Sequence, residues 1–157
     1  MKKLKAAVIG VGGISNEHIN GYIKNENVDL YAFCDINEKQ LKFMSEKYGI
    51  PAERCFTDKD EMLKALPEID IVSVCTWNSA HAECTIAALN AGKNVLCEKP
   101  MDISYKNACL MKKISIDTGK NLGIIFQNRY STGPKFIKEK FKNGDLGRIV
   151  SASAELM

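Results

Sequence analysis

The sequence lacks the features of several large classes of protein. No apolar run approaches the roughly 18 residues that a membrane span requires, so we expect no membrane partner. Its 22 basic residues exceed the 19 acidic ones by only three, too small an excess to indicate a nucleic-acid partner. It contains no internal repeat and no low-complexity segment. What remains is a chain of 157 residues, 45% of them hydrophobic, which is long enough to bury a core without a disulfide or a metal.

Metal-binding and disulfide patterns are also missing. The six cysteines form no Cys-x-x-Cys pair, and there are only two histidines, His18 and His81, so we expect no metal site. Cys34, Cys75 and Cys97 lie inside apolar, strand-like runs, where cysteine behaves as a small hydrophobic residue. We therefore interpret the cysteines as reduced thiols of a cytoplasmic protein.

The N-terminus offers one alternative to a cytoplasmic location. Lys2, Lys3 and Lys5 precede the apolar stretch 6–14, which resembles a short signal peptide. No small-x-small cleavage site follows, and a glycine-rich turn interrupts the apolar run. These two features favour the cytoplasmic interpretation.

Strand-like and helix-like patterns alternate along the chain. Short apolar runs predict strands at 4–9, 28–34, 55–57, 69–75, 94–97 and 122–126. Helical periodicity fills the segments between them, at 14–25, 37–48, 58–67, 79–91 and 104–117, and a further helix is predicted at 133–142. Asn37 with Gln40, and Asp58 with Glu61, have the spacing of helix-capping pairs. Strands separated by helices favour right-handed crossovers, so the predicted fold is α/β with a doubly wound parallel sheet.

The end of the chain has a different pattern. From Val150 to Leu156 apolar and polar residues alternate, which predicts a half-buried strand of the kind found in antiparallel sheets. We therefore place a first domain, with the predicted doubly wound sheet, at residues 1–126 and the beginning of a second, α+β domain at 127–157.

A glycine-rich turn follows the first strand and opens the first helix. Gly10 allows a tight turn, Gly12 lets the main chain approach a pyrophosphate, and the small Ser15 allows close packing of helix and strand. The N–H groups around Gly13 and Ile14 would meet the phosphate charge. Glycine also ends strands for structural reasons alone, so the turn needs supporting context.

Asp35 supplies that context. It closes the second strand 23 residues after Gly12, where dinucleotide-binding proteins place the carboxylate that accepts hydrogen bonds from the adenosine ribose. A carboxylate there favours NAD and repels the 2′-phosphate of NADP, although Lys39 could partly accommodate a phosphate. The structural alternative is an aspartate that only caps the following helix.

Three motifs together carry a family resemblance. They are the glycine-rich turn with His18 shortly after it, Thr76-Trp77-Asn78 with His81, and Glu98-Lys99-Pro100. In this combination the chain resembles the glucose-fructose oxidoreductase / inositol dehydrogenase / MocA family, whose members are NAD(P)-dependent dehydrogenases of sugars, inositols and related compounds. The resemblance extends to Gln127-x-Arg129 and to 144–149. It implies that the domain at 1–126 is a Rossmann domain that binds a dinucleotide cofactor.

The resemblance implies a role for each motif. Lys99 would hydrogen-bond the reacting oxygen of the substrate, Pro100 would follow a cis peptide, and Glu98 would approach the nicotinamide ribose. The remaining residues would line the cofactor near its centre or lie near the nicotinamide or substrate; these are Thr76, Trp77, Asn78, His81, Gln127 and Arg129. The family usually has proline where Trp77 stands, which leaves the shape of that loop open.

Most of these residues also have a structural interpretation. Lys99 could be a solvated loop lysine, and Trp77 could cover a hydrophobic edge. His81 could cap or pack a helix, and we expect His18 to pack rather than to act chemically. The basic helix 133–142 is expected to present a solvated face.

The resemblance also implies parts that these residues do not contain. The family's proton-accepting histidine lies in a second domain, and no histidine follows His81. That domain would supply the pocket for a small sugar or polyol and the sheet through which members commonly pair, so homo-oligomerisation stays open. We therefore expect the cofactor-binding half of a dehydrogenase, shortened naturally or artificially and inactive alone. The alternative is a stand-alone nucleotide sensor or protein-interaction module that uses the final strand.

Overall fold

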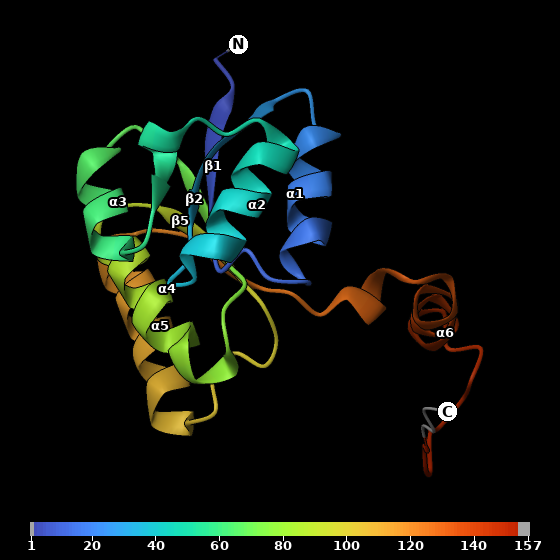
Figure 1. Cartoon of the computed structure of the whole chain (residues 1–157). Coiled ribbons are helices and arrows are strands. Elements are labelled where there is room, and N and C mark those ends of the chain that lie inside the picture. The colour runs from blue at the N-terminus through green and yellow to red at the C-terminus, as the bar shows by residue number, and fades with distance from the viewer. Residues whose placement is uncertain (1, 154–157) are drawn as a thin grey trace. The chain divides into compact units, whose positions relative to one another are not determined.

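The computed structural model describes residues 2–153 and divides into two units between Ile125 and Phe126. The first unit is built on six parallel strands in the order β3-β2-β1-β4-β5-β6 (Figure 1). Their bounds are β1 Leu4–Ile9, β2 Val28–Cys34, β3 Cys55–Phe56, β4 Ile71–Val74, β5 Asn94–Cys97 and β6 Leu122–Ile124. The strand order reverses at β1, which confirms the predicted doubly wound sheet.

Helices cover both faces of this sheet. One face packs against α1 (Ser15–Ile23) and α2 (Glu38–Tyr48), and the other against α3 (Lys59–Ala65), α4 (His81–Asn90) and α5 (Tyr105–Thr118), as Figure 1 shows. Side chains of β1 alternate between the two cores, with Ala6 and Val8 on the α1 side and Ala7 and Ile9 on the α4 side. All four are buried, which explains why this strand reads as a continuous apolar run.

The helix ends follow the sequence closely. The side chain of Asn37 accepts hydrogen bonds from the N–H groups of Lys39 and Gln40, and Gly49 ends α2 in the left-handed conformation. Asp58 caps α3 in the same way. Gln40 differs from the capping-box pattern, because its Nε2 donates to the carbonyl of Val11 at 2.8 Å. It therefore ties α2 to the glycine-rich turn.

Up to residue 153, the second unit contains a short 3₁₀ turn, Gln127–Tyr130, and the helix α6, Thr132–Lys142. The apolar side chains of α6, Phe136, Ile137 and Phe141, are exposed. The strand predicted from Val150 is wrong over 150–153, which form no strand, and its remainder lies outside the described residues. A strand forms only where another strand satisfies its hydrogen bonds, and alternation alone does not provide one.

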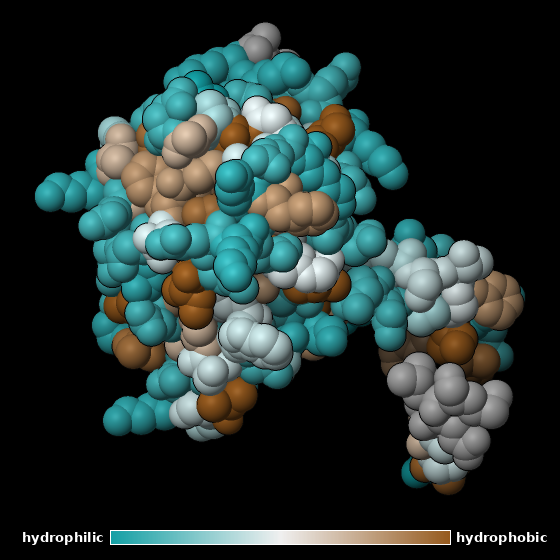
Figure 2. Space-filling model, viewed as in Figure 1, coloured by the Kyte–Doolittle hydropathy of each residue, from teal (hydrophilic) through white to brown (hydrophobic). Residues whose placement is uncertain are grey.

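The surface and the cysteines of the chain bear on the features that the sequence excluded or predicted. Figure 2 shows a first unit covered largely by hydrophilic residues, with separate hydrophobic areas between them. Within residues 2–153, no helix combines the length and the apolar character that crossing a membrane would require. All six cysteines are free, as predicted, and only Cys109 is exposed.

Candidate functional site: a dinucleotide cleft at the strand ends

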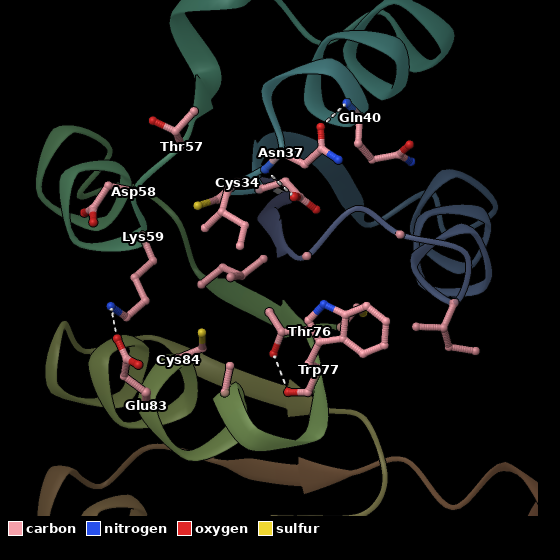
Figure 3. Close-up of a pocket in the computed structure, with 18 of the residues that line it drawn as sticks. Cys34, Asn37, Gln40, Thr57, Asp58, Lys59, Thr76, Trp77, Glu83 and Cys84 are labelled. Atoms are coloured by element: carbon pink, nitrogen blue, oxygen red, sulfur yellow. Dashed lines mark hydrogen bonds and ion pairs between the residues drawn. The ribbon is translucent and has the colours of Figure 1, made fainter.

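A cavity of about 780 Å³ opens at the carboxyl ends of the strands around β1. Its lining comes from the loops after β1, β2, β3 and β4 and from the start of α4 (Figure 3). Open α/β sheets bind ligands at this place. The connections that follow the two neighbouring strands run to opposite faces of the sheet, which leaves a crevice between them. Of the residues that the sequence singled out, the cavity is lined by Gly10, Gly12, Gly13, Ile14, Asp35, Thr76 and Trp77.

The glycine-rich turn forms one wall of the cavity. Gly10 has a φ of +84°, and a Cβ on it would lie 2.8 Å from main-chain atoms of Cys75 and Thr76. A Cβ on Gly12 or Gly13 would instead meet no atom within 4 Å. In residues 2–153, the N–H groups of Gly12, Gly13 and Ile14 donate no hydrogen bond inside the protein. The turn therefore presents main-chain donors without side chains in front of them.

Asp35 lies beside this turn and is held by main-chain donors. Its Oδ2 accepts from the N–H of Val11 and its Oδ1 from the N–H of Asn37, each at 2.8 Å. Each carboxylate oxygen retains a second lone pair that can accept from a ligand hydroxyl. Asp35 thus fixes the turn to the end of β2 and also faces the cavity.

The loop after β4 forms the opposite wall. The Trp77 side chain is 83% exposed, and it lies across the cavity from Lys59 and Glu83 in Figure 3. Asn78 begins a 3₁₀ turn that leads into α4 and lies outside the cavity lining. His81 is fully buried, with Nδ1 2.7 Å from the carbonyl of Pro100 and Nε2 3.2 Å from that of Thr76. A neutral imidazole has a single N–H and donates to only one of these carbonyls, so His81 lies between the two loops and contacts both of them.

Sequence reasoning missed the far end of the cavity. Lys59 Nζ lies 2.6 Å from Glu83 Oε1, an ion pair visible in Figure 3, and 3.2 Å from Asp60 Oδ2. The hydrogen bond with Glu83 raises the pKa of Lys59, so this cation is fully charged at neutral pH. Thr57 and Asp58 line the same end. They follow β3 directly, so the rule that ligands sit at strand ends would have found them had it been applied to this short strand.

Two thiols also face the cavity. Figure 3 shows the sulfur atoms of Cys34 and Cys84 turned toward it. Burial raises the pKa of Cys34 to about 12 and that of Cys84 to about 11. Both groups are therefore protonated thiols at neutral pH, and they offer a ligand an apolar surface rather than a nucleophile.

The residues predicted to act near the substrate lie beyond this lining. Glu98 is buried at the end of β5, whereas Lys99 and Pro100 are exposed. The Lys99–Pro100 peptide bond is cis, as predicted. Gln127 and Arg129 are exposed residues of the second unit. The structure thus brings the glycine-rich turn and Asp35, the candidates for binding phosphate and ribose, together at one cavity. Glu98, Lys99 and Pro100 follow β5 and lie outside its lining.

The chemistry of the cavity fits a dinucleotide. Unpartnered N–H groups at a helix start suit phosphate oxygens, and an adjacent carboxylate suits the hydroxyls of a ribose. The open space at the Cβ positions of Gly12 and Gly13 leaves room for close approach of the main chain. The volume of the cavity also falls in the range of about 300–1,000 Å³ that is typical of small-molecule sites.

Comparison with known proteins agrees with this geometry. Residues 4–126 match the model of the GFO_IDH_MocA group, described as an oxidoreductase family with an NAD-binding Rossmann fold. The chain belongs to this family, which confirms the resemblance found in the motifs.

The relatives include dehydrogenases of sugars and inositols. The chain is 34% identical to D-glucoside 3-dehydrogenase of Escherichia coli over 98% of its own length, and 32% identical to myo-inositol 2-dehydrogenase of Thermotoga maritima over 92%. A crystal structure of the WlbA dehydrogenase from Bordetella pertussis, in complex with NADH and UDP-GlcNAcA, superposes with a TM-score of 0.88 at 28% identity. That match covers 94% of this chain and 42% of the other. The chain spans 43% and 42% of the two curated relatives.

Proposed function

We propose that this chain is the NAD-binding part of a dehydrogenase that acts on the CH–OH group of a sugar, inositol or related polyol. The observation that carries the proposal is the wall of bare main-chain donors at Gly12, Gly13 and Ile14 with Asp35 beside it. These donors would hold the pyrophosphate, and Asp35 would accept from the adenosine ribose. The two curated relatives named above, which are sugar and inositol dehydrogenases, support the substrate class.

The same carboxylate supports NAD over NADP. The two oxygens of Asp35 are fixed by the main chain of Val11 and Asn37, so the side chain cannot turn away from a ligand without breaking those bonds. A 2′-phosphate would bring negative charge against it. Lys39 lies in the first turn of α2 and is exposed to solvent, where a single cation offsets little of the repulsion between Asp35 and a 2′-phosphate.

In the proposed reaction, bound NAD supplies the hydride acceptor. Lys99 would donate a hydrogen bond to the reacting oxygen, and Glu98 would approach the ribose on the nicotinamide side. His81 would hold the two loops of the crevice in register through Thr76 and Pro100. No histidine follows His81 in this sequence, so the proton acceptor would come from residues outside it. The chain alone is therefore expected to bind without turnover.

The only tryptophan offers a direct test of binding, since Trp77 lines the cavity. We expect NADH to quench its emission and to gain sensitised emission of its own, because the nicotinamide ring would come within energy-transfer range. Excess NAD should reverse the effect, and NADPH should require at least about tenfold higher concentration, given the charge at Asp35. Absence of energy transfer at millimolar NADH would overturn the proposal. Oxidation of myo-inositol or glucose by the chain alone would contradict the expectation that it binds NAD without turnover.

A further inference from the structure

A chain of buried side-chain hydrogen bonds crosses the first unit from α1 to the end of β5. The Tyr22 hydroxyl lies 2.7 Å from Ser73 Oγ, and Ser73 Oγ lies 2.8 Å from His18 Nδ1. His18 Nε2 then meets Glu98 Oε1 at 3.0 Å. The other oxygen, Oε2, accepts from the N–H of Lys99 at 3.1 Å. The network thus connects the helix of the glycine-rich turn to the Glu-Lys-Pro loop.

The network lies almost entirely out of solvent. Ser73 is fully buried, and the side chains of His18 and Glu98 are only 6% and 8% exposed. Burying four polar side chains is costly unless each one finds partners, and here each does. An apolar side chain in place of His18 would leave the buried Glu98 carboxylate and Ser73 hydroxyl without this partner. His18 therefore does more than fill space at this position.

The donors and acceptors form one consistent sequence. An ionised Glu98 only accepts, so Nε2 of His18 must carry the proton of that bond. In the neutral imidazole Nδ1 then accepts from the Ser73 hydroxyl, and Ser73 accepts from Tyr22. Burial raises the pKa of Tyr22 to about 12, so this phenol keeps its proton and remains a donor at neutral pH.

The location of the network indicates what it serves. Ser73 lies one residue before the end of β4, and Glu98 follows β5, so the chain ends at the carboxyl edge of the sheet. Asp35 ends β2, on the other side of β1. In a doubly wound sheet the two halves of a dinucleotide lie on opposite sides of the switch point. With the adenosine at Asp35, the nicotinamide half lies on the side of Glu98.

We propose that His18 is a positioning residue for the nicotinamide half of the cofactor. It holds Glu98 in place through Nε2, and Glu98 in turn holds the main chain of Lys99. Ser73 and Tyr22 fix the ring of His18 and its tautomer from the other side. This replaces the expectation that His18 only packs, and it rests on the proposed function.

ADP separates this role from binding in general, because it retains the adenosine and both phosphates but lacks nicotinamide and the ribose that Glu98 would approach. Calorimetric titration of the full chain with NAD and with ADP gives a ratio of affinities. We expect His18→Ala to lower the NAD to ADP ratio about tenfold, the effect of losing one charge-assisted hydrogen bond, while ADP binds as to the wild type. His18→Gln, whose amide can still donate to Glu98, should recover part of the ratio.

Two further variants make the outcome decisive. Ser73→Ala keeps the shape of the core and removes the partner of Nδ1, so the ratio should fall in the same direction but less. Asn20→Ala changes an exposed side chain of the same helix and should leave the ratio unchanged. If His18→Ala does not fold, the Ser73→Ala result decides.

The possible results distinguish failure of the proposed role of His18 from failure of the proposed function. Equal loss of NAD and ADP affinity in His18→Ala, or an unchanged ratio in both His18→Ala and Ser73→Ala, overturns the role of His18 and leaves the proposed function standing. Failure of the wild type to bind NAD overturns the proposed function itself.

Discussion

At the scale of single residues, substitutions at Gly10 and Gly12 are expected to affect stability and cofactor binding separately. Gly10→Ala should lower the free energy of unfolding by about 3 kcal/mol, because a left-handed conformation alone costs a non-glycine residue about 1–3 kcal/mol. Its Cβ would in addition lie 2.8 Å from the main chain of Cys75 and Thr76. Urea unfolding measures this loss.

Gly12→Ala is the matched substitution. Its Cβ would enter open space and its φ lies outside the left-handed range, so stability should change by less than about 1 kcal/mol. NAD affinity should nevertheless fall at least about tenfold, since the methyl group would keep the phosphates from the main chain. A Gly12→Ala chain that binds NAD as tightly as the wild type would place the phosphates elsewhere.

Asp35→Asn tests the choice of cofactor. The substitution removes the charge that opposes a 2′-phosphate, so the preference for NAD over NADP should decrease about tenfold. The amide nitrogen would also face a main-chain N–H, of Val11 or of Asn37, which should cost about 1–3 kcal/mol of stability. Paired titrations with NAD and NADP, together with thermal unfolding, measure both effects. An unchanged preference would show that the discrimination has another origin.

At the scale of elements, the N-cap of α3 predicts a pH dependence. Hydrogen bonds from the N–H groups of Glu61 and Asp60 hold the pKa of Asp58 below its usual value of 3.8. The folded chain therefore binds the Asp58 proton less readily than the unfolded chain. The charged cap stabilises fully above pH 3.8, and its contribution is lost as the pH falls through the lowered pKa of the folded state.

Asp58→Asn keeps a capping oxygen and removes the titration. The wild type should be more stable than this variant at pH 7, and the difference should shrink as the pH is lowered below 3.8. Urea unfolding across that range measures it. A stability difference that is constant from pH 7 to pH 3 would contradict the assignment of the shift to the cap.

Elements that depend on local chemistry were predictable from the sequence. Asn37, Gly49 and Asp58 end helices because their side chains or main chain satisfy groups within a few residues. The strand expected from Val150 failed over 150–153 because a strand depends on a partner that periodicity does not reveal. The capping-box pattern pairs the side chain of Gln40 with the main chain of Asn37, but in the structure it donates to the carbonyl of Val11, which is distant in sequence.

At the scale of the whole molecule, the sequence predicted one half of the site better than the other. Gly12 and Asp35 are linked by a known spacing within one β-α-β unit, so their approach could be anticipated. The His18–Glu98 pair joins residues 80 positions apart, and nothing in their spacing indicates it. Such a contact exists only once β4 and β5 are packed beside β1.

The central claim is that dinucleotide phosphates bind to the N–H groups of Gly12, Gly13 and Ile14. Amide chemical shifts, followed by two-dimensional NMR of the ¹⁵N-labelled chain during titration with NAD, report on these groups individually. We predict that, among residues lining the cavity near the glycine-rich turn, these three amides show the largest chemical-shift changes on NAD binding. Gly12→Ala should abolish these changes. Resonances that stay in place while NAD saturates the chain, or an NAD titration without any response, would contradict the account.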